Sequence, residues 1–284
     1  MRLLFLLVLF LSGACSAELP DLRSVAPELR VPAVTAGEPA AGRRVRRTLP
    51  PYRGTEVHHV LYLPVDWRAD RRFPVIVEYA GNGSYSNRFG DVCDGTVESS
   101  SLGYGASGGK GFIWVCAPYV SPDHQRNQRL WWGDVEATVA YCTGVVADVC
   151  ANYQGDPSAV FLAGFSRGSI ACNFIGLHND AVAALWRGFI CHSHYDGVRA
   201  WSYAGSDRAA AAVRLARLRG RPQFISQEGS VAETQAYLTN ACPSGRFTFV
   251  PLPYRNHTDQ WSLRNLPERA ALRAWLAEQL KGAD

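Results

Sequence analysis

The chain has 284 residues, of which 47% are hydrophobic and 19% charged, and its formal net charge is +4. This composition excludes a disordered or fibrous chain, and the length allows one sizeable hydrophobic core. The positive excess includes the cluster Arg43, Arg44, Arg46 and Arg47, which we interpret as a solvated strand edge rather than a nucleic-acid surface.

The first 17 residues have the pattern of a signal peptide. Arg2 precedes an apolar run over residues 3–11, which is too short to span a bilayer well, and small residues follow. A cut after Ala17 predicts an exported protein, periplasmic or secreted, with no transmembrane span in the mature chain. Cleavage before Cys15, to give a lipoprotein, is the alternative.

Residues 18–41, rich in Pro, Ala and Glu, are predicted to form a tether or a strap, and residues 42–284 a single domain. Of the eight cysteines one is Cys15, so seven remain after cleavage. Export makes disulfides possible, with at least one thiol left over. Cys142 and Cys150 lie on one predicted helix, about 12 Å apart at its rise per residue, which is beyond the reach of a disulfide.

Beyond residue 55 the hydrophobic pattern alternates between strand and helix signals. Strands are predicted at 57–63, 73–79, 112–117, 159–163, 189–192, 222–226 and 247–252. Helices are predicted at 134–153, 169–177, 206–218, 232–239 and 267–280. Two early strands followed by repeated strand–helix units predict an α/β fold, with a mostly parallel β-sheet and helices on both faces. In such sheets, chemistry gathers at the carboxyl ends of the strands.

The strand at 159–163 leads through Gly-Phe-Ser166-Arg-Gly into the helix at 169–177. A serine in such a tight turn has an exposed hydroxyl and a strained backbone, and the flanking glycines let strand and helix pass closely. A second Gly-x-Ser-x-Gly at 105–109, which overlaps Gly-x-Gly-x-x-Gly at 103–108, precedes a strand and opens no predicted helix. We interpret that segment as a flexible loop, and Ser166 as the nucleophile.

The segment around Ser166 resembles the nucleophile elbow of the α/β-hydrolase superfamily, and the order of elements over residues 55–281 is similar to that fold. The resemblance implies a catalytic triad in the chain order serine, acid, histidine, with the histidine after the last strand. His257 directly follows the strand at 247–252. It is expected to take the proton of Ser166 and return it to the leaving group.

The triad acid is left open between two carboxylates. Glu228 follows the strand at 222–226, the position that the resemblance favours, whereas Asp196 follows the preceding strand, an alternative position in the superfamily. Glu233 is better explained by the start of the next helix, where a negative charge is favourable. We predict Glu228 and keep Asp196 as the alternative.

The resemblance also implies an oxyanion hole. One donor is the backbone N–H of Arg167, and the second comes from the loop after an early strand. The segment Ala-Gly-Asn82-Gly-Ser after the strand at 73–79 is rich in small residues, so backbone donors there can approach a substrate oxygen. The segment departs from the glycine-rich form common in the superfamily, and we favour Asn82 as the donor.

His192-x-His194-x-Asp196 is similar to a metallo-β-lactamase motif, but Gly197 stands where that motif has another histidine. The ligand count falls short, so no metal and no cofactor are predicted. A metallohydrolase using these three residues remains an alternative. A catalytically silent binding protein with the same fold is another, because fold alone does not establish activity.

These features together predict an exported serine hydrolase, a carboxylic ester hydrolase acting through a Ser166 acyl-enzyme. Peptide hydrolysis is less expected because no propeller or lid domain is evident. The substrate is expected to be a small-molecule or carbohydrate-linked ester, with no nucleic-acid partner. Several aromatic residues lie in presumed cleft loops, although core packing explains most of them: Tyr79, Tyr85, Phe89, Tyr119, Trp131 and Trp132.

Overall fold

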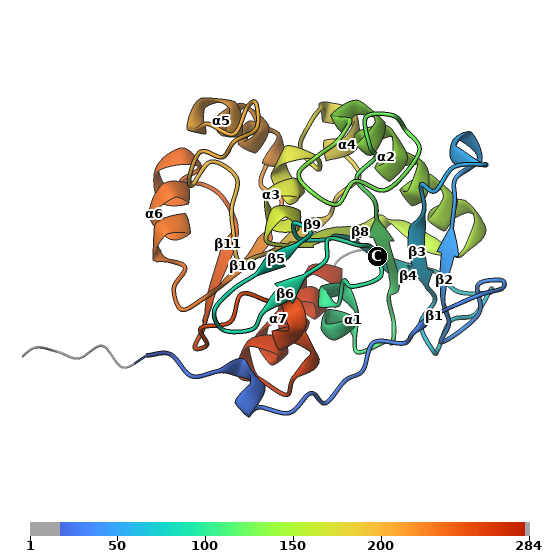
Figure 1. Ribbon diagram of the computed structural model, residues 1–284, viewed down its shortest axis with the longest axis horizontal. Helices are drawn as coiled ribbons and strands as arrows, with labels where there is room; N and C mark the ends of the chain where they lie inside the picture. Colours follow the sequence, from blue (N-terminus) through green and yellow to red (C-terminus); the bar gives the residue numbers. More distant parts are fainter. Residues whose placement is uncertain (1–17, 282–284) are drawn as a thin grey trace, which may run out of the picture.

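A computed structural model describes residues 18–281, so the predicted signal peptide lies outside the described residues. A nine-stranded sheet crosses the molecule in the order β1-β2-β3-β7-β4-β8-β9-β10-β11 (Figure 1). The strands from β7 to β11 along this order are parallel, while β3 is antiparallel to both of its neighbours. The mostly parallel sheet predicted from the sequence is confirmed.

The strands of the sheet are β1 (Val34–Thr35), β2 (Arg44–Arg47), β3 (His59–Tyr62), β4 (Phe73–Tyr79), β7 (Ile113–Ala117), β8 (Gly155–Phe165), β9 (Gly188–His192), β10 (Gln223–Glu228) and β11 (Phe247–Leu252). A separate hairpin is formed by β5 (Tyr85–Ser86) and β6 (Val92–Cys93). It extends from the loop after β4, at the end of the sheet where the parallel strands finish.

The helices are α1 (Leu102–Ser107), α2 (Val135–Asn152), α3 (Arg167–Phe174), α4 (Asp180–Ala183), α5 (Arg208–Leu215), α6 (Ala232–Ala241) and α7 (Pro267–Leu280). Short 3-10 turns are η1 (Leu22–Ser24), η2 (Pro50–Tyr52), η3 (Ala216–Leu218) and η4 (Asp259–Leu263). Helices α2 to α6 cover one face of the sheet, and α1 and α7 cover the other (Figure 1). Each face carries its own hydrophobic core, because parallel strands are apolar on both sides.

Two sequence predictions are corrected by tertiary contacts. The segment predicted as a flexible loop contains helix α1, whose first N–H groups, on Leu102 and Gly103, donate to the buried carboxylate of Glu78 at 3.1 and 2.7 Å. The arginine cluster is not uniformly solvated. Arg44 is 3% exposed, because its guanidinium donates to backbone carbonyls and lies 4.5 Å over the ring of Trp114.

The cysteines also differ from expectation. The seven in the described residues are free thiols, so the predicted disulfides are absent there. Four of them are buried, on core-facing positions of strands and helices, where apolar packing accounts for them: Cys116, Cys142, Cys172 and Cys191. Within residues 18–281, no helix is both long enough and apolar enough to cross a membrane.

The segment 18–41, which includes the short strand β1, runs as a strap along the α1 and α7 side of the molecule (Figure 1). Leu22 in the strap is 2% exposed, and the N–H groups of Glu28 and Leu29 both donate to the carbonyl of Leu263 at 2.9 Å. The strap therefore packs on the domain formed by the residues that follow it.

Candidate active site

Ser166 stands at the turn between β8 and α3. Its φ of 55° and ψ of −115° form a conformation that persists only where the surrounding structure enforces it. The Ser166 N–H donates to the carbonyl of His192 at 2.9 Å. Glycines are required here, since a Cβ at Gly164 would lie 2.1 Å from the carbonyl carbon of Gly168, and one at Gly168 only 1.9 Å from the carbonyl oxygen of Tyr79. The strand, turn and helix predicted around Ser166 are present.

His257 and Glu228 reach Ser166 from neighbouring strand ends. Glu228 is the last residue of β10, and His257 lies in the loop after β11, which runs parallel to β10. His257 Nε2 lies 3.0 Å from Ser166 Oγ, and His257 Nδ1 lies 2.6 Å from Glu228 Oε1. The structure thus brings the three residues into one continuous line of hydrogen bonds, with Nδ1–H as the donor to Glu228 and Nε2 free to accept from Ser166.

The carboxylate of Glu228 is held in its charged form. Burial on its own raises the pKa of Glu228, but the hydrogen bond from His257 and the nearby charge on that ring outweigh burial and lower the pKa to about 2. An ionised acceptor at this position fixes the tautomer of the imidazole and stabilises the imidazolium form.

Ser193 is a residue that the sequence analysis missed. Its Oγ lies 2.9 and 2.8 Å from the two carboxylate oxygens of Glu228 and 2.7 Å from His257 Nδ1, so its hydroxyl donates to Glu228 beside the imidazole. Its φ of 86° is unusual for a serine and shows that the chain after β9 is constrained. The only signal in the sequence was its place at the end of a strand next to a candidate acid.

Asp196, the alternative acid, is not brought to His257. Its two oxygens accept from Nε and Nη2 of Arg214 at 2.8 and 2.9 Å, in a bidentate pair with the Asp196 side chain 1% exposed. Arg214 comes from α5. Asp196 therefore anchors a helix at the edge of the site.

The loop that carries His257 is fixed by a buried carboxylate that the sequence analysis did not single out. Asp91 Oδ2 accepts the backbone N–H of His257 at 2.9 Å, and Asp91 Oδ1 accepts from the Asn256 side-chain amide at 2.8 Å. Asn256 Oδ1 in turn accepts the backbone N–H of Leu22 at 2.6 Å. A chain of hydrogen bonds therefore joins the strap to the candidate catalytic histidine.

Arg167 supports the site in two ways. As the first residue of α3, it has a backbone N–H that no carbonyl of its own helix accepts, which leaves this group free for the predicted oxyanion hole. Its side chain is buried, with the guanidinium donating to the carbonyls of Gly81 and Trp131, each at 2.7 Å, and to that of Ala80 at 3.4 Å. Arg167 therefore clamps the loop after β4.

Asn82 lies in that loop. Its Oδ1 accepts the backbone N–H of Trp131 at 2.8 Å, so its side chain is committed to holding two loops together. Asn82 and Arg167 both line the cavity that contains Ser166. Because the Asn82 side chain is engaged in this way, its backbone N–H is the group that the predicted oxyanion hole would use.

The catalytic cavity, as we call this space, has a volume of about 170 Å³. It is lined by Asn82, Tyr85, Cys93, Trp131, Ser166, Arg167, Ile170, His194, Trp201 and His257. Tyr85 and Trp131 are thus the predicted cleft aromatics that line this cavity, whereas Tyr79, Tyr119 and Trp132 are buried in the core.

The residues of the metal alternative do not converge. Both ring nitrogens of His192 are engaged, Nδ1 with Ser226 Oγ and Nε2 with the carbonyl of Thr258, each at 3.0 Å, and burial lowers the pKa of His192 to about 4. His194 lines the catalytic cavity, while Asp196 is paired with an arginine. Among the described residues, no group of three or more His, Cys, Asp or Glu side chains is placed to hold a metal ion.

Comparison with known proteins gives no family model that matches this chain and no curated protein that does. Solved structures do match. A thermostable esterase superposes with a TM-score of 0.52 over 83% of this chain and 62% of its own, at 13% identity. One of two fungal esterases from Rhizomucor miehei has a TM-score of 0.55 over 83% and 82% of the two chains, at 11% identity. The AtxE2 isopeptidase has a TM-score of 0.51 over 82% of this chain and 39% of its own, at 17% identity.

The chain has the α/β-hydrolase fold. This chain spans less than two thirds of the length of the thermostable esterase and of the isopeptidase, and all three identities are low, so the likeness is one of fold. Within the α/β-hydrolase fold, Ser166 follows β8, which neighbours the central strand β4, whereas Glu228 ends β10 and His257 follows the edge strand β11.

Proposed function

We propose that this protein is a serine hydrolase that cleaves carboxylic esters through an acyl-enzyme on Ser166. The observation that carries the proposal is the unbroken line from Ser166 Oγ through His257 to Glu228, with separations of 3.0 and 2.6 Å. A nucleophile within hydrogen-bond distance of a base that is itself oriented by a carboxylate is the arrangement that activates a serine.

The chemistry follows from these positions. Ser166 attacks the ester carbonyl as His257 Nε2 takes its proton, and the negative oxygen of the tetrahedral intermediate accepts hydrogen bonds from the N–H groups of Arg167 and Asn82. His257 then gives the proton to the leaving alcohol, and the acyl group remains on Ser166. Water, activated by the same imidazole, releases the acid and restores the serine. Glu228 stays ionised throughout.

Export is part of the same proposal. The signal-peptide pattern over residues 1–17 supports a periplasmic or secreted enzyme, with lipidation at Cys15 as the alternative. N-terminal sequencing of the protein purified from its host is the test. A mature chain beginning at Glu18 supports cleavage after Ala17, and a lipidated Cys15 supports the lipoprotein.

The test of the chemistry uses short-chain 4-nitrophenyl esters and a fluorophosphonate probe. We expect hydrolysis, stoichiometric labelling of Ser166, and loss of both in Ser166→Ala. The matched control is Ser107→Ala, since Ser107 is the serine of the second Gly-x-Ser-x-Gly and lies at the end of α1. Labelling elsewhere, or full activity in Ser166→Ala, would contradict the mechanism.

Two further experiments distinguish the proposed esterase from a metallohydrolase and from a peptidase. Chelators are expected to leave the rate unchanged; a rate lost to chelation with a stoichiometric transition metal would favour the metallohydrolase that uses His192, His194 and Asp196. Peptide 4-nitroanilides are expected to be poor substrates, because the order of elements over residues 18–281 includes no propeller or lid domain. A protein that binds esters without turnover would be the silent alternative.

A further inference from the structure

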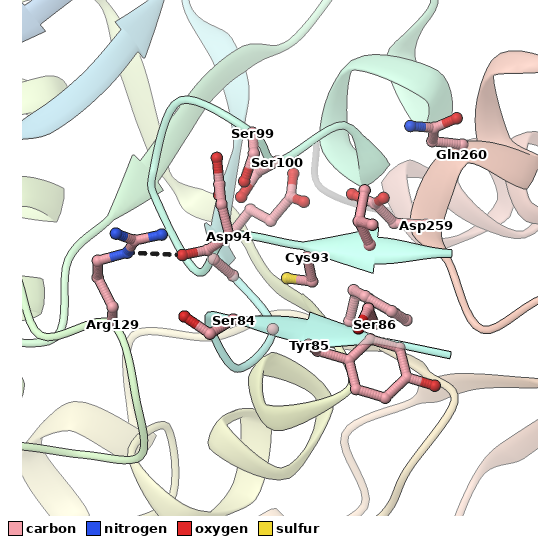
Figure 2. A pocket seen from close by; sticks show the side chains of 15 residues that line it. Ser84, Tyr85, Ser86, Cys93, Asp94, Ser99, Ser100, Arg129, Asp259 and Gln260 are labelled. Carbon is pink, nitrogen blue, oxygen red and sulfur yellow. Dashed lines mark hydrogen bonds between the residues drawn. The ribbon is translucent and has the colours of Figure 1, made fainter. Parts of the chain in front are cut away.

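A second cavity, of about 440 Å³, is lined in part by both strands of the β5–β6 hairpin, and Figure 2 shows its side chains. We call it the polar cavity. It is lined by Glu78, Ala80, Gly81, Ser84, Tyr85, Ser86, Val92, Cys93, Asp94, Ser99, Ser100, Arg129, Phe165, Asp259 and Gln260. Its volume lies in the range of sites that hold small organic ligands. The mechanism proposed above uses none of its polar side chains.

The polar cavity adjoins the catalytic cavity on the side of His257. Tyr85 and Cys93 line both cavities. The rings of Tyr85 and Phe165, which both line the polar cavity, lie 5.0 and 4.8 Å from the imidazole of His257, measured between centroids. A molecule in the polar cavity therefore lies one side chain away from the imidazole that would protonate the leaving group.

Five of the residues that line this cavity carry a hydroxyl group: Ser84, Tyr85, Ser86, Ser99 and Ser100. In Figure 2, Ser99 and Ser100 lie above the hairpin, and Ser84 and Ser86 lie along its lower strand. The side chains of Ser84, Ser86 and Ser99 are exposed to solvent, whereas the Ser100 hydroxyl is buried out of reach. An alkyl chain in this space would displace water from the exposed hydroxyl groups without replacing its hydrogen bonds, at about 1–3 kcal/mol for each group left unsatisfied. A ligand with hydroxyl groups would satisfy them.

Each charged side chain of the cavity makes at least one hydrogen bond within the protein. Arg129 Nε donates to the carbonyl of Asp94 at 2.7 Å, as the dashed line in Figure 2 shows. Glu78 accepts the first N–H groups of α1, and Asp259 accepts the N–H of Ser101 at 2.8 Å. The carboxyl groups make the site unfavourable for an anionic ligand, and no set of metal ligands is present among the described residues. A neutral polyhydroxylated ligand fits best.

The position of the cavity assigns a part of the substrate to it. In the mechanism proposed above, the alcohol leaves on the side of His257, so the alcohol portion of the ester lies toward the polar cavity. The acyl portion lies in the catalytic cavity of about 170 Å³, where Ile170, Trp131 and Trp201 limit its length. Resting on the proposed function, we infer that the substrate is a short-chain acyl ester of a carbohydrate hydroxyl, with the sugar bound in the polar cavity.

The test compares two acetates that differ in hydroxyl groups but not in ring size: methyl xyloside monoacetate and cyclohexyl acetate. We expect the unmodified enzyme to prefer the sugar acetate by at least tenfold in kcat/KM. The side chain of Gln260 is exposed to the polar cavity. Gln260→Ala is expected to reduce that preference about 2- to 10-fold, the value of one hydrogen bond, mainly through KM. Ser86→Trp, which fills the space, is expected to reduce it more.

The matched control is Gln235→Ala, at an exposed position of α6 away from both cavities. It is expected to leave the preference unchanged. No preference for the sugar acetate, or a preference that survives both Gln260→Ala and Ser86→Trp, would overturn the inference while 4-nitrophenyl acetate hydrolysis still supports the esterase. Failure of the proposed function would appear differently, as no turnover of any acetate and no fluorophosphonate labelling.

Discussion

The guanidinium of Arg167 donates to the carbonyl oxygen of Gly81 at 2.7 Å, so the residue after the nucleophile holds the loop that faces the nucleophile. The same group lies 3.9 Å over the ring of Tyr119, and burial lowers its pKa. Its acceptors are backbone carbonyls, which fix the course of the loop without a counter-charge. The spacing of the two predicted oxyanion-hole donors thus depends on one side chain.

Arg167→Lys is expected to lower kcat about 10- to 100-fold with little change in KM. Lysine keeps the charge but lacks the planar fork that bonds several carbonyls at once, so the Asn82 loop shifts relative to Ser166. Removing an oxyanion-hole donor lowers kcat about 10²- to 10³-fold, and we expect a displaced donor to lower kcat by less. Steady-state kinetics on 4-nitrophenyl acetate measure the effect. An unchanged kcat in folded Arg167→Lys would show that the clamp has no role in turnover.

Glu228→Gln is expected to lower kcat about 10²- to 10⁴-fold, because the neutral amide no longer stabilises the imidazolium of His257. Asp196→Asn is expected to act on stability instead. It leaves the guanidinium of Arg214 buried without its counter-charge, at a cost of about 3–5 kcal/mol in the free energy of unfolding. Turnover per labelled active site and urea unfolding separate the two effects. Near-normal turnover in Glu228→Gln would exclude Glu228 as the triad acid.

Asp91→Asn is expected to lower kcat about tenfold while KM stays close to normal. The amide has one acceptor oxygen, so either the Asn256 side chain or the His257 N–H loses its partner, and an unsatisfied buried donor costs about 1–3 kcal/mol. The imidazole then spends less time aligned with Ser166. Asp70→Asn, at an exposed site, is the matched control. If Asp91→Asn only lowers the melting temperature and leaves kcat intact, its role is confined to stability.

The folded protein is expected to lose stability as the pH falls from about 6.5 to about 4. Burial lowers the pKa of His59 and His194 to about 3 and of His192 to about 4, whereas a histidine in the unfolded chain titrates near about 6.5. Between these values the unfolded chain binds more protons, so the free energy of unfolding decreases as the pH decreases.

Urea unfolding at a series of pH values measures this loss, and His59→Phe tests its origin. His59 is buried on β3, away from the site, and its replacement removes one titrating group. Between about pH 4 and 6.5, we expect the slope of the free energy of unfolding with pH to decrease by up to about 1.4 kcal/mol per pH unit. The variant also loses the hydrogen bond to Tyr141, but that loss is the same at every pH and does not change the slope. An identical slope in the variant would show that His59 titrates normally in the fold.

The sequence by itself determined the fold class and predicted the two residues of the proposed reacting pair, Ser166 and His257. The elbow at Ser166 is local, because strand, turn and helix are encoded in consecutive residues and need glycines at fixed places. Parallel strands end on one edge of the sheet, so a histidine after the last strand and carboxylates after earlier ones were bound to lie near that elbow.

The choice between carboxylates needed the tertiary structure. Glu228 and Asp196 both follow strands, and nothing local distinguishes them; what separates them is Arg214, which α5 brings back to pair with Asp196. The same reason applies to α1. Its sequence has little helical character, with two glycines among its six residues. It is helical because the carboxylate of Glu78, on β4, accepts its first N–H groups.

The supporting residues of the site were also decided only in three dimensions. Asp91 reaches His257 from a hairpin 166 positions earlier, and the Arg167 side chain holds a loop 86 positions away. Such contacts leave no periodicity or motif in the sequence, because they depend on where distant loops meet once the sheet has formed. Candidate catalytic residues can be recognised from their order along the chain. The residues that position them, such as Asp91 and Arg167, can be recognised only from their neighbours in the folded structure.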